Sequence, residues 1–273
     1  MTMKTVFGSI LFDEKKEMMI SFFDSLNKQT NQDFDILFIN DNAPLDNIKQ
    51  IINTFDNIKN KITIIDSEEN KRYSNRIQLI KESKQRGYDL LIRGDFDDTW
   101  SINRVDNYIK SYDTNYGFFY NGIVNESYNS VFKDFPKYIN DYKEIGQYNF
   151  IGESSAGINL NNISYEFIDS LYKGKTIVFD WYLFTRMLLN NIPGKYIDDA
   201  YTIYRIWENT AAGIPSLTEK EISKELEYKR IHYDLLKDEN AYYYDLYTKY
   251  NDPNNIKYNH FDSYYWWNLT YVD

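Results

Sequence analysis

Apolar and polar positions along the first part of the chain alternate between two kinds of segment. Short β-rich apolar runs predict strands over residues 5–12, 35–39, 61–65 and 88–93, and apolar residues at helical spacing predict helices over 14–29, 45–55 and 75–86. This strand–helix–strand rhythm implies right-handed crossovers and a mainly parallel, doubly wound α/β sheet flanked by helices. Ligands bind at the carboxyl ends of the strands in such sheets, so the loops that begin at Asn40, Asp66 and Gly94 are the candidate site.

After Trp100 the pattern becomes less regular. It predicts helices over residues 103–112 and 180–190, strands over 118–124 and 155–160, and short strands near Lys195 and Thr202. Beyond residue 213 the composition shifts, because Thr218 and Glu221 form a capping box that opens a charged helix, and an aromatic-rich tail follows. We therefore expect one domain over residues 1–213 and a helical, aromatic-rich C-terminal appendage over 214–273.

Composition and charge exclude several classes of protein. Without cysteine the chain has no disulfide, zinc-ribbon or iron–sulfur ligands, and its two histidines, His232 and His260, argue against a multi-histidine metal site or a histidine-centred hydrolytic triad. The net charge of -10 argues against nucleic acid as a partner, so an anionic ligand needs a local basic spot or a metal ion. No apolar run approaches the roughly 20 residues of a membrane span, and no signal-peptide pattern is present, so we expect a cytoplasmic protein.

The clearest candidate chemistry follows the strand predicted over residues 88–93. Neither G-x-G-x-x-G after the first strand nor G-x-x-x-x-G-K-[ST] occurs, so the sheet must hold a nucleotide in another way. Three carboxylates, Asp95, Asp97 and Asp98, follow the strand instead. Asp95 and Asp97 alternate with Phe96 and can converge on one side, where a hard cation such as Mg²⁺ or Mn²⁺ offsets their repulsion. The alternative is a solvated turn in which Asp98 caps the next helix.

Four segments, in this order, resemble the GT-A glycosyltransferases, specifically the family 2 type. They are residues 26–41, the D-x-D-like Asp95-Phe96-Asp97-Asp98, Phe179-Asp180-Trp181 at a helix start, and Tyr204-Arg205-Ile206-Trp207-Glu208-Asn209. The resemblance implies a GT-A, Rossmann-like fold and inverting transfer of a sugar from a nucleotide-sugar donor to a hydroxyl acceptor, with Mn²⁺ or Mg²⁺. UDP is the nucleotide we expect, with GDP and dTDP open. The acceptor would be a glycan or a lipid-linked or protein-linked hydroxyl, in surface glycan or polysaccharide synthesis.

On the donor side, the resemblance implies a role for three residues. Asp41 would contact the nucleotide base, and Asp95 would contact the ribose or a metal-bound water. Arg76, or alternatively Arg72, would touch the pyrophosphate or the base. Without the resemblance, we would interpret Asp41 as part of an Asx-turn or as the cap of the next helix.

The resemblance also implies metal ligands and shows two departures. Asp97 would bind the metal directly, and Asp98 would be a second ligand or a helix cap. The first strand of the family usually ends in Pro-Thr-Tyr-Asn, whereas residues 9–13 read Ser-Ile-Leu-Phe-Asp, so donor contacts from this loop are not carried over. Trp207 stands where many relatives have a histidine after Tyr-Arg, so any metal-binding role of that histidine is lost here or passes to Glu208.

On the acceptor side, Asp180 is the candidate general base, because inverting transfer needs a carboxylate that removes the proton of the attacking hydroxyl. Its structural alternative is a favourable interaction with the helix dipole. Glu153, in a loop expected to be exposed, and the aromatic Trp181 and Trp207 are further acceptor-side candidates. We expect the aromatic cluster over residues 264–267 to pack the tail onto the domain. Stacking on sugars, or contact with the inner membrane face near a lipid-linked acceptor, are the alternatives.

Two other functions stay open at this point. A nucleotidyltransferase also places carboxylates and a metal at strand ends, but it would normally show a Gly-rich, Lys- or Arg-containing N-terminal loop, and residues 9–14 contain none. A catalytically silent sugar- or protein-binding module could use the same scaffold. The D-x-D segment and Asp180 favour the enzyme, whereas Trp207 favours the silent module.

Overall fold

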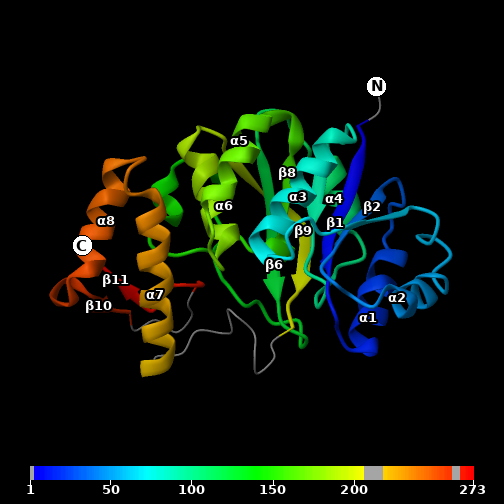
Figure 1. The fold of residues 1–273 in the computed structure, drawn as a ribbon, viewed down its shortest axis with the longest axis horizontal. Helices are drawn as coiled ribbons and strands as arrows, with labels where there is room; N and C mark the ends of the chain where they lie inside the picture. The colour runs from blue at the N-terminus through cyan, green and yellow to red at the C-terminus, as the bar shows by residue number, and fades with distance from the viewer. Residues whose placement is uncertain (1–2, 206–217, 260–264) are drawn as a thin grey trace.

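The computed structural model describes residues 3–205, 218–259 and 265–273, which form a central sheet with helices on both faces (Figure 1). Within these residues, nine strands form one sheet in the order β3-β2-β1-β4-β8-β6-β9-β5, with β7 paired to β9. The strands of this sheet are β1 (Thr5–Leu11), β2 (Asp35–Asn40), β3 (Ile62–Asp66), β4 (Leu90–Arg93), β5 (Thr99–Trp100), β6 (Phe118–Val124), β7 (Tyr138–Ile139), β8 (Ala156–Asn159) and β9 (Gly194–Ile203). A separate two-stranded sheet consists of β10 (Lys257–Tyr258) and β11 (Thr270–Tyr271).

The helices enclose the sheet between two apolar layers. They are α1 (Lys16–Asn27), α2 (Leu45–Ile52), α3 (Arg72–Gln85), α4 (Arg104–Ser111), α5 (Tyr165–Ser170), α6 (Phe179–Leu189), α7 (Glu219–Leu236) and α8 (Ala241–Asn251), with short 3-10 turns η1 (Tyr142–Ile145), η2 (Glu153–Ser155), η3 (Leu160–Asn162), η4 (Leu171–Lys173) and η5 (Pro253–Asn255). One apolar cluster joins α1, α2 and α4 to the sheet, and another joins α3, α5 and α6 to it. Val6 and Phe7 of β1 belong to different clusters, because successive side chains of a strand point to opposite faces.

The sheet is parallel from β3 through β2 and β1 to β4, as predicted. Beyond β4, strand β8 runs antiparallel to both β4 and β6, β6 and β9 are parallel, and β5 and β7 run antiparallel to β9. The prediction of a mainly parallel α/β sheet with flanking helices is confirmed. Because β8 is antiparallel to β4, the start of β8 lies beside the end of β4, and residues 152–155 reach the candidate site.

Helix α3 begins at Arg72, three residues before the start predicted at Asn75. The earlier start places Arg72 and Arg76 one turn apart on the same side of the helix. Gly87, with a φ of 74°, follows the C-terminal end of α3 in the left-handed region, as its position predicted. The first turn of α3 therefore carries two arginines toward the carboxyl ends of the strands.

The two short strands predicted near Lys195 and Thr202 are one strand, β9. Its pairing with β6 shifts register between Asn121 and Gly122, which is the mark of a bulge. A bulge interrupts the alternation of apolar and polar residues, and for that reason the sequence pattern showed two segments.

The C-terminal appendage shares an apolar core with the rest of the chain. Thr218 accepts a hydrogen bond from the backbone N–H of Glu221 and caps α7. Tyr233 of α7 and Tyr243 of α8 lie in the same buried cluster as Trp181 of α6. The boundary predicted after residue 213 lies outside the described residues, so the division into two domains stays a prediction.

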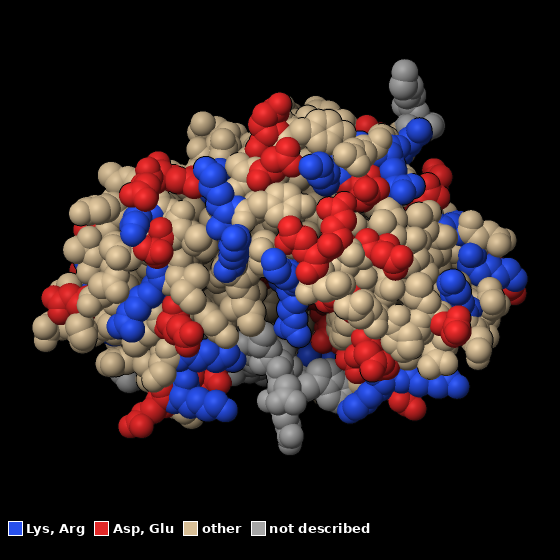
Figure 2. Space-filling model, in the orientation of Figure 1, with Lys and Arg blue, Asp and Glu red and all other residues tan. Residues whose placement is uncertain are grey.

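The surface carries charges of both signs. Figure 2 shows Lys and Arg side chains interspersed with Asp and Glu over one face of the molecule. Among the helices that the structure describes, none is both long enough and apolar enough to span a bilayer.

His232 lies in the core that joins the appendage to α6. Its ring stacks on Trp181 with centroids 4.0 Å apart, and neither ring nitrogen has a hydrogen-bond partner among the described residues. Burial, with a smaller contribution from Lys229, lowers the pKa of His232 to about 3. The folded protein therefore favours a neutral imidazole.

We expect acid to destabilise the protein partly through His232. Between pH 6.5 and 3 the unfolded chain binds a proton at this position that the folded chain does not, so the free energy of unfolding falls as the pH falls. When the pH falls from 7.5 to 5, the free energy of unfolding of wild type should fall by about 2 kcal/mol more than that of His232→Phe. Urea unfolding at the two pH values measures this difference. A difference between the two proteins that does not change with pH would contradict this account.

Candidate functional site

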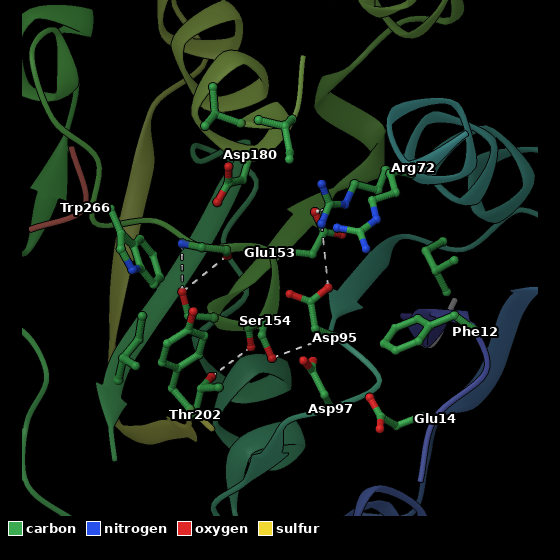
Figure 3. Close-up of a pocket in the computed structure, with 18 of the residues that line it drawn as sticks. Phe12, Glu14, Arg72, Asp95, Asp97, Glu153, Ser154, Asp180, Thr202 and Trp266 are labelled. Carbon is green, nitrogen blue, oxygen red and sulfur yellow. Dashed lines mark hydrogen bonds and ion pairs between the residues drawn. The ribbon is translucent and has the colours of Figure 1, made fainter. Parts of the chain in front are cut away.

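A cavity of ≈ 640 Å³ lies at the carboxyl ends of β1, β2 and β4. Its lining includes most of the residues that the sequence singled out: Asp41, Arg72, Arg76, Asp95, Asp97, Glu153 and Asp180. The site therefore forms where strand ends meet in an α/β sheet, as predicted. Figure 3 shows Asp95 and Asp97 on one side of this cavity and Asp180 above them.

The D-x-D segment forms a tight turn directly after β4. The backbone N–H of Asp98 donates to the carbonyl of Asp95 at 3.2 Å, and Phe96 is fully buried in the apolar layer beneath. Asp95 and Asp97 line the cavity on the other side of the turn, as their alternation predicted. Burial raises the pKa of Asp95 to about 7, with Arg76 opposing the shift and Glu153 and Asp97 adding to it. Burial likewise raises the pKa of Asp97.

Asp98 does not cap the next helix. Its Oδ1 accepts the backbone N–H of Arg205 at 3.1 Å, whereas the N-cap of α4 is Asn103. Asp98 is 1% exposed, and its Oδ2 has no hydrogen-bond partner among the described residues. Burial, with Asp97 and Asp95 close by, raises its pKa well above the ordinary value. The three aspartates each offer a carboxylate oxygen, and these oxygens lie within 4.8 Å of one another.

Glu153 is buried, although we expected it in an exposed loop. It is 5% exposed and forms ion pairs with the fully buried Arg93 and with Arg76, whose Nε lies 3.2 Å from Glu153 Oε2. Arg76 Nη2 lies 3.8 Å from Asp95 Oδ1, so a line of alternating charges connects β4, α3 and the D-x-D turn. Burial would lower the pKa of Arg76, but Glu153 and the site aspartates raise it, and the guanidinium stays charged.

Sequence reasoning missed Arg93 and Ser154. Arg93 is the last residue of β4, whose other residues are apolar and buried. A charged residue at the end of such an apolar strand could have identified it as a candidate site residue. Ser154 fixes the loop before β8: its carbonyl accepts hydrogen bonds from Arg104, Trp100 and Thr202, and its Oγ accepts the backbone N–H of Asp95. No sequence pattern marks a carbonyl group for such a role.

Asp180 lies in the first turn of α6. Its Oδ1 accepts the backbone N–H of Trp181 at 2.9 Å, which fixes the orientation of the carboxylate. The side chain points into the cavity (Figure 3). Burial raises the pKa of Asp180, while Arg76 acts in the opposite direction. A partly buried carboxylate with a raised pKa at the wall of a cavity suits a general base.

Asp41 lies on the side of the cavity formed by β1 and β2. Its backbone N–H donates to the carbonyl of Leu11 at 2.7 Å, which joins the ends of the two strands. The side chain that bonds to the backbone of this turn is that of Asn40, whose Oδ1 accepts the N–H of Ala43, and the N-cap of α2 is Pro44. The Asp41 carboxylate therefore has neither of the local roles that we weighed against ligand binding.

The tryptophans differ from their predicted roles. Trp181 is fully buried and donates its indole N–H to the carbonyl of Ile145, so the prediction that it faces an acceptor is wrong. Asp180 and Trp181 are consecutive, and consecutive helical residues point about 100° apart, so only one of them can face the cavity. Trp207 and Glu208 lie outside the described residues. Trp266 and Trp267, which we expected mainly to pack the tail onto the domain, line the cavity.

Residues 10–177, more than half of the chain, match the protein family described as glycosyl transferase family 2. No curated protein matches the sequence. The fold is similar to TarS 1–349 of S. aureus in complex with UDP-GlcNAc, with a TM-score of 0.62 and 14% identity over 91% of this chain and 72% of that one. It is also similar to the mannosyltransferase PcManGT of Pyrobaculum calidifontis in complex with GDP-Man and Mn²⁺, with a TM-score of 0.55 and 9% identity over 86% and 64% of the two chains. The chain spans 43% of the TarS chain in another structure.

Proposed function

Because the chain belongs to glycosyl transferase family 2, we propose that it transfers a sugar, with inversion, from a nucleotide-sugar donor to a hydroxyl group of an acceptor. UDP is the nucleotide we propose, and Mn²⁺ or Mg²⁺ the cofactor. One observation carries the proposal: a single cavity holds the D-x-D carboxylates at the end of β4 and, on another wall, Asp180 at the start of α6. Such a site has a place for the leaving group and a separate base for the acceptor.

The three aspartates suit a hard divalent cation. Their carboxylate oxygens lie close together, and Asp98 Oδ2 is a buried oxygen without a hydrogen bond among the described residues. Mg²⁺ and Mn²⁺ prefer oxygen ligands of this kind. We propose Asp97 as the direct ligand and Asp98 as the second. When bound, the cation would neutralise charge on the departing nucleoside diphosphate.

The nucleotide would lie along the β1 and β2 side of the cavity. We propose that Asp41, at the end of β2, contacts the base and that Asp95 contacts the ribose. Arg76, with a raised pKa and two acidic partners, is a fixed positive charge for the pyrophosphate. Arg72, one turn earlier on α3 and exposed, is the alternative contact.

In the transfer step, Asp180 accepts the proton of the acceptor hydroxyl as its oxygen attacks the anomeric carbon from the face opposite the diphosphate. The new C–O bond forms as the bond from the anomeric carbon to the diphosphate oxygen breaks. The electron pair of the broken bond leaves with the nucleoside diphosphate, and the configuration inverts. The raised pKa of Asp180 makes its carboxylate a stronger base than an exposed aspartate.

Release of nucleotide from UDP-, GDP- and dTDP-sugars tests this function directly. We expect one class of donor to release its nucleoside diphosphate in the presence of Mn²⁺ or Mg²⁺, and a chelator to abolish the release. Binding of a nucleotide without release from any donor would favour the silent binding module. The proposed setting, synthesis of surface glycans, rests on family analogy.

A further inference from the structure

Aromatic residues of the C-terminal appendage line one side of the cavity. Tyr228 of α7 and Trp266 and Trp267 of the tail contribute to its wall, together with Ile177 and Val178, which lie three and two residues before Asp180. The three aromatic residues lie beyond residue 177, where the family match ends. In Figure 3, Trp266 lies across the cavity from Phe12, on the side away from the proposed nucleotide contacts.

Ring contacts connect these residues to the reaction site. The ring of Trp266 meets that of Tyr204 edge-on, with centroids 5.9 Å apart. Tyr204 lines the same cavity as Asp180, and burial, followed by the charges of Asp98, Asp95 and Asp97, raises the pKa of its hydroxyl. Trp267 in turn meets Tyr228 edge-on at 5.1 Å. Two pairs of aromatic rings, Tyr204 with Trp266 and Tyr228 with Trp267, therefore line the cavity that also holds the carboxylates.

The tail is held in place by buried polar contacts. The buried carboxylate of Glu225 accepts the backbone N–H groups of Leu269 and Thr270 at 2.9 and 2.7 Å. Glu225 is itself paired with the fully buried Lys229 at 3.2 Å. On the other side, the backbone N–H of Asn149 donates to the carbonyl of Trp266 at 2.9 Å. The position of the two tryptophans is therefore built into the fold.

Trp267 is placed at a conformational cost, and Trp266 packs closely on a glycine. Trp267 has a φ of 62°, in the left-handed region that a bulky side chain rarely adopts. A Cβ at Gly152 would lie 2.6 Å from the Trp266 ring, so that ring closes onto the loop before Glu153 only because residue 152 is glycine. Strained backbone of this kind clusters at functional sites.

We propose that Trp267 and Tyr228, supported by Trp266, form a stacking surface for a sugar ring of the acceptor, so that the acceptor is a glycan. The inference rests on the proposed function and names its acceptor class. A pyranose presents a face of C–H bonds that packs on an aromatic ring, and its hydroxyls reach outward to polar groups such as Asp180. A membrane-binding role would need these rings on the outer surface beside basic residues, whereas Trp266 is 7% exposed and lines the cavity.

Trp267→Asn tests the stacking surface without straining the fold, because asparagine tolerates the left-handed backbone. The probes are methyl glucoside, methyl galactoside and methyl N-acetylglucosaminide, with a serine peptide and n-octanol as hydroxyls that lack a sugar ring. We expect a glycoside to accelerate nucleotide release by wild type, and Trp267→Asn to raise the KM for it about tenfold with a much smaller change in kcat. Trp267→Tyr, which keeps a ring, should restore the KM to within about twofold. Tyr244→Asn is the matched control, because Tyr244 is an exposed aromatic residue of α8 that does not line the cavity.

A second readout needs no turnover. Titration of the same glycosides, followed by tryptophan fluorescence, should show binding to wild type and about tenfold weaker binding to Trp267→Asn. Equal glycoside affinity in the two proteins, or acceleration by the peptide or octanol and by none of the glycosides, would overturn the inference. Failure of the proposed function would show instead as glycoside binding by wild type without nucleotide release from any donor.

Discussion

We expect Asp180→Asn to lower the turnover of sugar transfer by a factor of about 10²–10⁴, the usual contribution of a general base. The amide keeps an oxygen that can accept the backbone N–H of Trp181, so the side chain should keep its orientation. It cannot take the proton of the acceptor hydroxyl. The affinity for the nucleotide with Mn²⁺ should stay within about twofold of wild type, because Asp180 projects from α6 and is not one of the proposed nucleotide contacts, which come from β2, α3 and the D-x-D turn. Steady-state kinetics and calorimetry measure the two quantities separately.

Asp46→Asn provides the matched control for Asp180→Asn. Asp46 is also an aspartate in the first turn of a helix, α2, but it is exposed and does not line the cavity. If Asp180 served only the helix dipole, both variants would lose about 0.3–1 kcal/mol of stability and neither would lose turnover. Unchanged turnover in Asp180→Asn would refute its role as the base, as would a loss of nucleotide affinity in proportion to the loss of turnover.

The second large effect is expected at Glu153. Glu153→Gln should lower the free energy of unfolding by about 3–5 kcal/mol, the usual result of removing one partner from a buried ion pair. The reason is that Arg93 is fully buried, and its Nε and Nη1 have no hydrogen bond among the described residues, so Glu153 is its closest compensation. Urea unfolding at pH 7 measures the change.

Two further variants distinguish the stability lost when this buried ion pair is broken from the stability lost when an exposed ion pair is broken. The double variant Glu153→Leu/Arg93→Met removes both charges together and should recover most of the lost stability. Asp169→Asn breaks the exposed pair with Lys81 and should cost no more than about 1 kcal/mol. A cost for Glu153→Gln as small as that for Asp169→Asn would show that the buried pair does not hold the loop before β8.

The parts of the fold and site that could be predicted are those set by local sequence. Alternation and helical spacing mark the first strands and helices, and the D-x-D turn follows from three carboxylates directly after an apolar strand. The opposite directions of Phe96 and its two flanking aspartates follow from the geometry of an extended turn.

The parts that could not be predicted depend on contacts between distant segments. Glu153 was expected to be exposed because the sequence does not show that β8 runs antiparallel to β4 and carries this residue to Arg93. Trp181 was expected to face an acceptor because the pattern does not show which side of α6 meets α7. Trp266 lines the cavity because Glu225 of α7, which lies about 40 residues earlier in the chain, binds the backbone of the tail just after the tryptophan.

Calorimetric titration of UDP, GDP and dTDP, with and without Mn²⁺, on wild type and Asp97→Ala tests whether the end of β4 is a metal-dependent donor site. We predict that one nucleotide binds wild type only when the metal is present and that Asp97→Ala, still folded by circular dichroism, loses this binding. If no nucleotide binds under either condition, or if binding is indifferent to both the metal and the substitution, a metal-dependent donor site at the end of β4 is contradicted.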